Sequence, residues 1–417
     1  MINRSIAPPA NPIGNIHFIM PEVNPLDNEI LIHSFNLASQ DVINIELVFH
    51  CGYWDSIENP LIAKFTPKML LEGTTSKTAK EISEIFDFYG AYLHITTGLH
   101  YTTISLAVLT EKLPQVLPLF EEIIKNPSFP ESEFETMRKN AHQKFLIKSK
   151  ENGFVARNKF YRSLFGMTHP YGRETEEGDY KSINIDEIKN FYQKYFSENN
   201  CQIFIAGGFD ESEVFSLLNN VFGKNWRKSS KPVHHYDISP EDKYLHVEKP
   251  EALQSAIKIG CVTINKHHPD YPKLQVANMM LGGFFGSRLM KNIREDKGYT
   301  YGIYSSVISY LQSGIFSITT ETGVEYTQNT IQEIYNEIHR LQNGPITPDE
   351  LKLVKNYILG HLLKNFDGVF EINQRYKDAL LSNLEYPTYY EQFIKTVKQI
   401  TTEEIQFMAQ KYFDTSK

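Results

Sequence analysis

Apolar and polar residues alternate with two different periods along this chain. Alternation at every second residue predicts strands at residues 29–35, Val42–Phe49 and Thr102–Leu109. Elsewhere apolar residues recur at every third or fourth position, which predicts helices over residues 76–89, 111–125, 130–149 and 154–165. Residues 1–28 show neither period and are expected to be an irregular lead-in. Long helices and strands in one chain indicate a mixed α and β fold.

The second half of the chain repeats the first at a constant, ungapped offset. This offset places Glu133 on Glu350 and brings two copies of QKYF together, at residues 193–196 and 410–413. Two expected helix starts correspond as well, each with the spacing of a capping box: Asn184 with Glu187, and Thr401 with Glu404. An offset that stays constant over so long a stretch predicts a duplicated domain.

A polar segment separates the two copies. Residues 224–243 are poor in apolar side chains and contain two prolines, which is typical of a linker. The sequence therefore predicts an N-terminal domain at residues 1–223 and a C-terminal domain at residues 244–417. The copy of residues 201–206 would begin at position 418, so we expect the second sheet to be one strand short, unless the sequence is truncated.

Charge and cysteine content exclude several classes of protein. The chain has 42 basic and 50 acidic residues, a net charge of -8 and no basic block, so nucleic acid is not an expected partner. Cys51, Cys201 and Cys261 lie in apolar runs and are expected to be buried, reduced thiols. No apolar run is long enough for a signal peptide or a membrane span. We expect a cytoplasmic protein, or a periplasmic one if a signal peptide was removed.

One stretch carries a degenerate motif. Residues 61–74, LIAKFTPKMLLEGT, resemble the zinc helix of the insulinase-like metallopeptidases, the family of pitrilysins and mitochondrial processing peptidases. That family carries His-x-x-Glu-His in this register. The frame residues that match are Ala63, Phe65, Met69, Leu70, Gly73 and Thr74. The resemblance puts Lys64 and Lys68 at the zinc-binding histidines and Pro67 at the general-base glutamate. The third family ligand is a glutamate, and the usual family spacing places it at Lys144.

These substitutions remove the zinc chemistry. Zinc takes imidazole nitrogen, thiolate or carboxylate ligands, and an ammonium group has no free electron pair to give. Pro67 cannot activate a water molecule, and it is expected to break the helix so that Asn59-Pro60 begins one piece and Thr66-Pro67 a second. We expect no zinc at Lys64, Lys68 and Lys144, and no cofactor. The lysines are expected to point apart or to pair with acids such as Glu72. Alternatively they hold an anion, or this is an ordinary amphipathic helix with exposed lysines.

A second segment keeps its motif. Residues 281–306, LGGFFGSRLMKNIREDKGYTYGIYSS, resemble the most recognisable C-terminal segment of the same family. Arg288, Arg294, Gly298 and Tyr301 match its pattern. In active relatives the pair corresponding to Arg294 and Tyr301 binds peptide substrate and steadies the oxyanion, a role that suits a guanidinium and a phenol. Alternatively Arg294 pairs with the turn around Glu295, and Tyr301 only covers the sheet.

The resemblance implies an α+β fold of two homologous domains, each a mostly antiparallel mixed sheet layered with helices, as half of a clamshell. Its leading functional implication is a subunit that is inactive alone. Such a subunit would bind peptides and supply Arg294 and Tyr301 to a zinc-bearing family member in a heterodimer, or to a second copy of itself. The alternative is a structural or peptide-binding scaffold with no role in proteolysis. A third hypothesis, an autonomous peptidase with other ligands, is disfavoured by the lysines.

Overall fold

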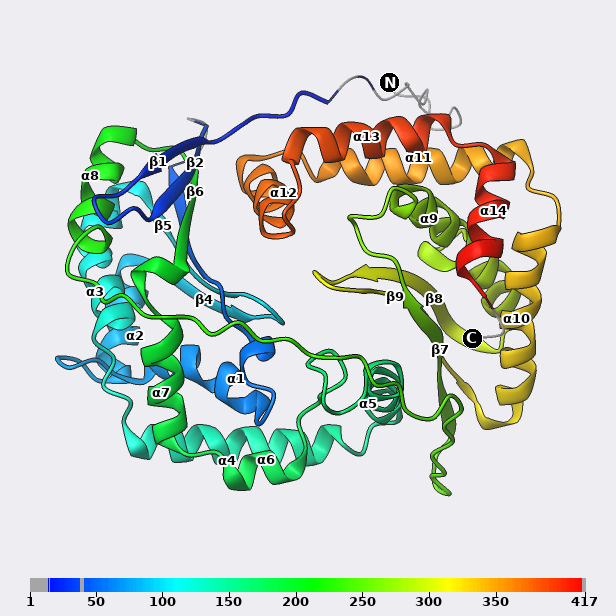
Figure 1. Cartoon of the computed structure of the whole chain (residues 1–417), viewed down its shortest axis with the longest axis horizontal. Helices are drawn as coiled ribbons and strands as arrows, with labels where there is room; N and C mark the ends of the chain where they lie inside the picture. The colour runs from blue at the N-terminus through cyan, green and yellow to red at the C-terminus, as the bar shows by residue number, and fades with distance from the viewer. Residues whose placement is uncertain (1–13, 15, 38–40, 415–417) are drawn as a thin grey trace, which may run out of the picture.

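The first of two β-sheets is built from the N-terminal half of the chain (Figure 1). The computed structural model describes residues 14, 16–37 and 41–414. Within them the first sheet has the strand order β1-β2-β6-β3-β5-β4, and only the β2–β6 pair is parallel. Its strands are β1 (Glu22–Pro25), β2 (Leu31–Asn36), β3 (Val42–Phe49), β4 (Tyr92–Thr97), β5 (Thr102–Leu109) and β6 (Cys201–Gly207). The strands expected at Val42–Phe49 and Thr102–Leu109 are confirmed. The lead-in was predicted wrongly at β1, whose EVNP sequence has no apolar alternation.

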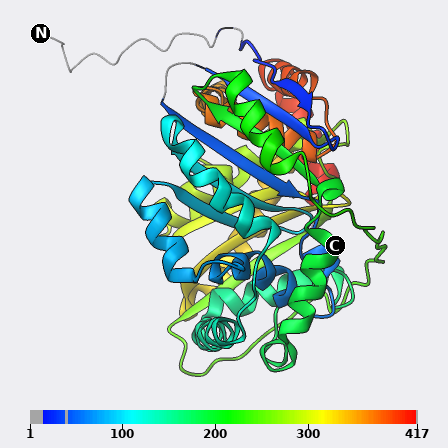
Figure 2. The ribbon, with the colours of Figure 1, turned by 90° about the vertical axis from the view of Figure 1, so that its left-hand side faces the viewer.

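Helices of the same half cover one face of this sheet, and Figure 2 shows several of them in front of the strands. Alternate residues of β3, such as Ile43 and Leu47, are fully buried beneath them. The helices of this half are α1 (Pro60–Met69), α2 (Ala79–Tyr89), α3 (Leu113–Lys125), α4 (Glu131–Lys148), α5 (Asn152–Phe165), α6 (Glu177–Ser182), α7 (Ile185–Tyr195) and α8 (Glu211–Phe222). Burial of apolar residues at every second strand position is what positions the sheet against its helices.

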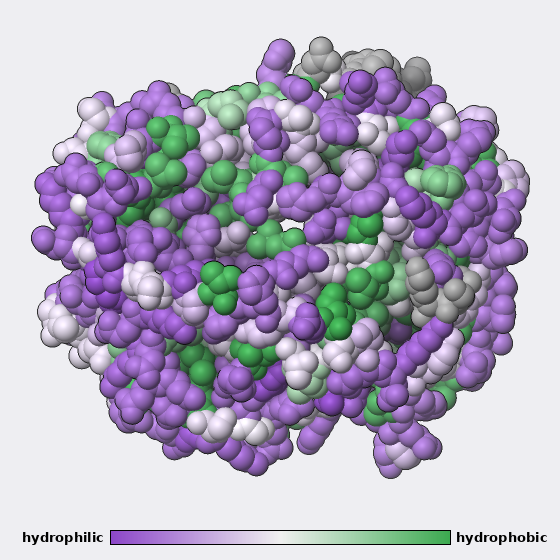
Figure 3. Space-filling model, viewed as in Figure 1, coloured by the Kyte–Doolittle hydropathy of each residue, from purple (hydrophilic) through white to green (hydrophobic). Residues whose placement is uncertain are grey.

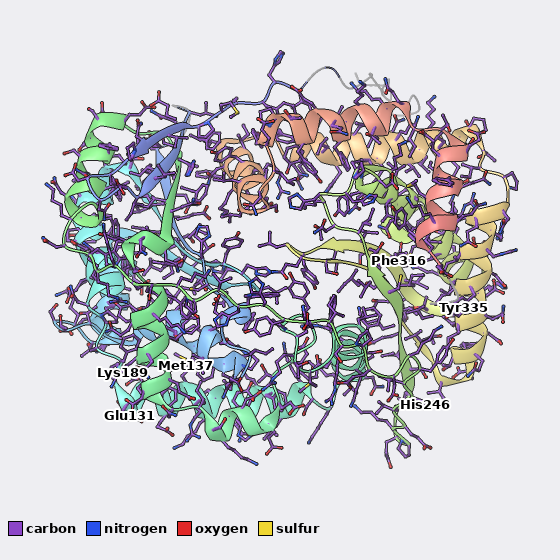
Figure 4. The ribbon with its side chains drawn as sticks, viewed as in Figure 1. Glu131, Met137, Lys189, His246, Phe316 and Tyr335 are labelled. Carbon is purple, nitrogen blue, oxygen red and sulfur yellow. The ribbon has the colours of Figure 1, made fainter. Side chains whose placement is uncertain are left out.

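The second sheet has three antiparallel strands in the order β7-β9-β8 among the residues described. They are β7 (Gln254–Thr263), β8 (Thr300–Ser309) and β9 (Gly314–Gly323). The helices of this half are α9 (Tyr271–Asn278), α10 (Thr327–Asn343), α11 (Pro348–Lys364), α12 (Val369–Leu381), α13 (Tyr386–Gln399) and α14 (Thr402–Tyr412). Phe316 of β9, labelled in Figure 4, stacks on Phe413 just after α14, with ring centroids 4.3 Å apart. This contact anchors the last helix to the sheet.

The helices follow the repeat that the sequence predicts. The offset that places Glu133 on Glu350 also carries α7 onto α14 residue for residue, and it carries α5 onto α12 with ends that differ by a single position. The capping boxes at Asn184 and Thr401 are both formed. Within the described part of the second sheet no strand takes the place that β6 has in the first. The two halves are therefore copies of one α+β unit, with a smaller sheet in the second.

One helix of each half packs on the sheet of the other half. α5 packs on β7 of the second sheet, and α12 packs on β6 and β2 of the first sheet, on the face opposite its own helices (Figure 1). Phe160 of α5 lies beneath the ammonium group of Lys258, 5.1 Å from ring centroid to nitrogen. Since α5 and α12 correspond in the repeat, the exchange is reciprocal. The two halves are therefore joined by buried side chains as well as by the connecting segment.

The connecting segment has no regular structure between α8 and β7, which all lies in the described range. It runs along the N-terminal half, where the Tyr236 hydroxyl donates to the Trp54 carbonyl at 3.2 Å and the Ser239 amide donates to the Phe165 carbonyl at 3.1 Å. The domain limits at residues 224–243 stay a prediction. The face seen in Figure 3 is mostly hydrophilic, with small groups of apolar residues. Among the described helices, none combines the length and the apolar composition needed to traverse a bilayer.

Candidate functional site

A cavity with a volume of about 790 Å³ lies between α1 and α4. Lys64, Lys68 and Lys144, the positions predicted to replace the zinc ligands, all line it. Met137 of α4, labelled in Figure 4, contributes to its apolar wall. Tyr310, which directly follows β8, is the lining residue supplied by the C-terminal half in the described chain. The fold therefore brings together lysines from two helices that are well separated in the sequence.

Helix α1 holds two of the lysines on one face. Asn59 caps the helix by accepting a hydrogen bond from the Leu61 amide at 3.0 Å, and Pro60 takes the first helical position, where its missing amide hydrogen costs nothing. Lys64 and Lys68 are four residues apart and so lie on the same side of the helix. The remaining positions, including Phe65, are buried against the core. The cap and the apolar face thus fix the direction in which the lysines leave the helix.

The helix break predicted at Pro67 is wrong. Residues Pro60–Met69 form one continuous helix, and Pro67 is buried within it on the side away from the solvent. Pro67 has no amide hydrogen, so one backbone hydrogen bond, to the Ala63 carbonyl, is forgone. The Thr66 hydroxyl donates to the Ile62 carbonyl at 2.8 Å. The helix continues through the proline with that one bond missing.

Charges in the cavity are separated into two groups. Burial, followed by the ammonium groups of Lys68 and Lys148, lowers the pKa of Lys64 from its ordinary value. Burial, followed by the carboxylate of Glu133, raises the pKa of Glu72 above its ordinary value. Lys64 is thus close to other cations, whereas Glu72 is close to another carboxylate. The predicted pairing of the lysines with acids such as Glu72 is absent: across the described residues, no salt bridge or side-chain hydrogen bond involves any lysine that lines the cavity.

The sequence reasoning did not single out Lys148. It lies on α4, four residues after Lys144, and lines the same cavity. The spacing alone was a usable signal, because residues four apart on a helix share a face. The aromatic wall formed by Tyr171 and Tyr310 could not be predicted. Their rings lie 4.4 Å apart between centroids and come from opposite halves of the chain.

This donor set does not fit zinc. Ammonium groups at the three ligand positions offer no electron pair to a cation and repel it, and Pro67 has no group that could act as a base. In the part of the chain that the structure describes, no cluster of three or more His, Cys, Asp or Glu side chains could hold a metal ion. The histidines at the centre of the molecule serve packing: His169 is buried and stacks on Phe165, with ring centroids 5.3 Å apart.

The two arginines of the second segment, Arg288 and Arg294, make different contacts. Arg288 is tied to α11, donating to both carboxylate oxygens of Glu350 at 2.7 and 2.9 Å. Arg294 lies on a π-helical turn, Met290–Asp296, with its guanidinium 4.4 Å above the centre of the Phe285 ring. Arg294 forms no salt bridge or hydrogen bond with any described residue, so the alternative that it pairs with the turn of Glu295 is not what the structure has.

Tyr301 points into solvent. It lies at the start of β8 and is 91% exposed, with no hydrogen bond to the hydroxyl from the described chain. Neither Arg294 nor Tyr301 lines the lysine cavity.

The cysteines behave more simply. Cys51, Cys201 and Cys261 are all thiols in the structure. The first two are buried, as predicted, and burial raises the pKa of both thiols. The prediction of full burial is wrong for Cys261, which is only half-buried because it lies on β7, in the smaller second sheet.

The fold and these sites define the class of protein. The model for the insulinase family, peptidase family M16, matches residues 32–169, and the model for the peptidase M16 inactive domain matches residues 182–358. Together the two models match both halves of the chain. The protein belongs to the insulinase-like family, peptidase family M16. The match to the inactive-domain model agrees with a non-catalytic member of that family.

Particular relatives agree with this assignment. An uncharacterized zinc protease of Bacillus subtilis, YmxG, is 26% identical over 314 residues, which cover 74% of this chain and 75% of that protein. A probable inactive metalloprotease of the same bacterium, YmfF, is 24% identical over 362 residues, 81% of this chain and 84% of that protein. A crystal structure of a peptidase M16 inactive domain from Pseudomonas fluorescens has the same fold. Its TM-score is 0.84 at 23% identity, over 94% of this chain and 95% of that one.

Proposed function

We propose that this protein is the non-catalytic subunit of an insulinase-like zinc peptidase. It binds peptide and supplies Arg294 and Tyr301 to an active site whose zinc is held by a partner subunit. The partner is a zinc-bearing member of the family, and the assembly works in the cytoplasm. A second copy of this chain would bring no zinc ligands, so a homodimer would be inactive.

The observation that carries the proposal is the free state of the Arg294 guanidinium. Arginine side chains near the surface of this fold are commonly engaged, as Arg288 is with Glu350. Arg294 is held in place by the Phe285 ring, a contact that orients a guanidinium while leaving its N–H groups available. The exposed hydroxyl of Tyr301 is equally available. An oriented guanidinium and an exposed hydroxyl, both without hydrogen-bond partners in the described chain, suit the stabilisation of charge that develops on a substrate oxygen.

Distance within the chain favours action in trans. Tyr310 follows the end of β8 at the lysine cavity, whereas Tyr301 is at the other end of the strand. At about 3.3 Å per residue, the strand is roughly 30 Å long. Tyr301 at that end is poorly placed to act on a peptide in the cavity of its own chain. It is free to approach a site on another subunit.

The test is peptide cleavage by a mixture with a zinc-bearing family member from the same organism. We expect the chain alone to hydrolyse nothing and the mixture to cleave peptide substrate. Arg294→Ala or Tyr301→Phe should lower turnover of the mixture by about 100- to 1000-fold, the usual effect of losing one oxyanion donor, with assembly intact on gel filtration.

Matched controls come from the same elements. Lys291→Ala removes an exposed positive charge from the turn that carries Arg294, and Tyr304→Phe removes a hydroxyl from an exposed tyrosine of β8. Both should leave turnover within about twofold. Full activity of the Arg294 and Tyr301 variants would instead favour the scaffold alternative, in which the protein binds peptide or partners without any part in proteolysis.

A further inference from the structure

The lysine cavity is not accounted for by the Arg/Tyr pair, because neither Arg294 nor Tyr301 lines it. Four of its lysines come in two pairs from facing helices, Lys64 with Lys68 on α1 and Lys144 with Lys148 on α4. Each pair has the spacing that puts both residues on one helix face. The four ammonium groups therefore converge on one space from two sides.

These ammonium groups are unpaired within the described chain: Lys64 is half-buried, and Lys68, Lys144 and Lys148 are exposed at the cavity. Other basic residues of the cavity wall are engaged: Arg157 pairs with Glu174 at 3.1 Å, and Arg173 with Asp179 at 2.6 Å. The cavity wall has six basic side chains and three carboxylates, although the chain as a whole carries a net charge of -8. A cluster of like charges is destabilising unless an anion joins it.

The acidic groups do not fill that role. Glu72 and Glu133 face the same cavity, yet neither forms a salt bridge with the lysines in the structure as described. Burial, followed by the carboxylate of Glu133, raises the pKa of Glu72, and no lysine is among the causes. Glu350, the counterpart of Glu133 in the repeat, is by contrast paired with Arg288. The lysines of the cavity therefore stay available to a carboxylate from outside the chain.

The rest of the wall is largely apolar and aromatic, with Phe65, Met137, Phe145, Phe154 and Tyr310 among its members. A volume of about 790 Å³ is that of a site for an extended organic ligand and far exceeds one small inorganic ion. An occupant that matches both features has several carboxylates and an apolar body.

We propose that this cavity binds an acidic peptide segment, whose carboxylates pair with Lys64, Lys68, Lys144 and Lys148 and whose apolar side chains lie on the aromatic wall. The site stands where the family's zinc ligands would be, and it has become an anion-binding site. The choice of a peptide rests on the peptide-binding role proposed above. The attraction for carboxylates rests on the geometry of the lysines alone.

The experiment measures binding to the chain by itself, without a partner and without turnover. The probes are a fluorescein-labelled decapeptide with four glutamates and two leucines, and the same peptide with glutamine at the four positions. We expect the acidic peptide to bind at least tenfold more tightly than the neutral one, with an affinity that falls as salt is raised. Lys64→Gln and Lys144→Gln should each weaken it about three- to tenfold.

Lys139→Gln is the matched control, because Lys139 is an exposed lysine of α4 outside the cavity. It should bind the acidic peptide as the unmodified chain does. A second measurement needs no variant: the acidic peptide should protect Lys64 and Lys144, but not Lys139, from an amine-reactive acetylating reagent, read by mass spectrometry.

The binding and acetylation measurements can contradict the acidic-peptide proposal in two ways. Equal binding of the acidic and neutral peptides, or unchanged binding and acetylation of the cavity lysines, would overturn the proposal. Lysine-dependent binding of inorganic phosphate or ATP without binding of the acidic peptide would overturn the peptide assignment. Failure here would leave cleavage by the mixed enzyme untouched. Loss of that cleavage would equally leave this binding result standing.

Discussion

At the scale of single residues, the lysine side chains differ in how deeply they are buried and in which charges lie near them. Lys64 is half-buried and close enough to Lys68 and Lys148 for their charges to lower its pKa. Lys68 and Lys148 are exposed, as Lys139 on the same helix as Lys148 is. A half-buried cation among like charges reduces stability.

Replacing Lys64 by Met should stabilise the chain. The methionine keeps the long side chain and removes a repulsion of the kind that costs about 0.2–0.5 kcal/mol per like-charge pair on a helix. We expect the free energy of unfolding at pH 7 to rise by about 0.5 kcal/mol in urea denaturation. Lys139→Met should change it by less.

The pH dependence of this gain has a definite sign. The pKa of Lys64 is lower in the folded chain than its ordinary 10.5, so the unfolded chain binds the proton more tightly. Stability of the unmodified chain therefore rises with pH between the lowered value and 10.5. The advantage of Lys64→Met should shrink across that window. An advantage that grows with pH would contradict the assignment of the repulsion.

At the scale of elements, helices were easier to predict than the contacts that hold them. Caps at Asn184 and Thr401 are local patterns, and both helices begin where those patterns place them. The strand β1 was missed because its four residues are all exposed and carry no alternation. The continuity of α1 through Pro67 was not predicted, because it depends on the buried surroundings of the helix.

The Arg288–Glu350 pair should prove structural. It is bidentate and largely buried, with 13% of the Arg288 side chain and 22% of the Glu350 side chain exposed, and it connects the glycine-rich segment to α11. Arg288→Ala leaves the carboxylate without its partner, which should lower the unfolding free energy by about 2–3 kcal/mol. Lys291→Ala, on the same segment, should lower it by less than about 0.5 kcal/mol. Equal effects in a chemical denaturation series would refute the structural role.

At the scale of the whole molecule, the reciprocal exchange of α5 and α12 determines how the halves are joined. Glu46 of β3 lies on the sheet face that α12 covers, and the ammonium group of Lys377 meets its carboxylate at 2.6 Å. Only 7% of the Lys377 side chain and 12% of the Glu46 side chain are exposed. Asn373 donates to the same oxygen at 3.3 Å. A buried ion pair thus fixes the register of a helix from one half on the sheet of the other.

Removal of one partner should loosen this junction. Lys377→Met leaves Glu46 buried and unpaired, and we expect a loss of about 3–5 kcal/mol in urea denaturation. The double variant Lys377→Met with Glu46→Gln should recover a large part of that loss, because no uncompensated charge remains. Lys395→Met, an exposed lysine of α13, is the control. A double variant no better than the single one would show that the charge pair is not what holds α12 in place.

The sequence by itself determined the features that are local or repeated. Periodicity predicted three strands and four helices of the N-terminal half, and the constant offset between the two copies predicted the duplication. The resemblance of residues 61–74 placed lysines, which offer no electron pair to zinc, at the ligand positions. Side-chain period and donor chemistry do not depend on distant contacts, which is why they could be read directly.

Only the tertiary structure decided which residues meet. It placed Lys148 with the other three lysines, kept Glu72 away from them, paired Arg288 with Glu350 and left Arg294 against an aromatic ring. In the tertiary structure, α5 and α12 also pack on the sheets of the opposite halves. Pairing, burial and the separation of charges depend on elements that are far apart in the chain. No pattern within a single segment contains that information.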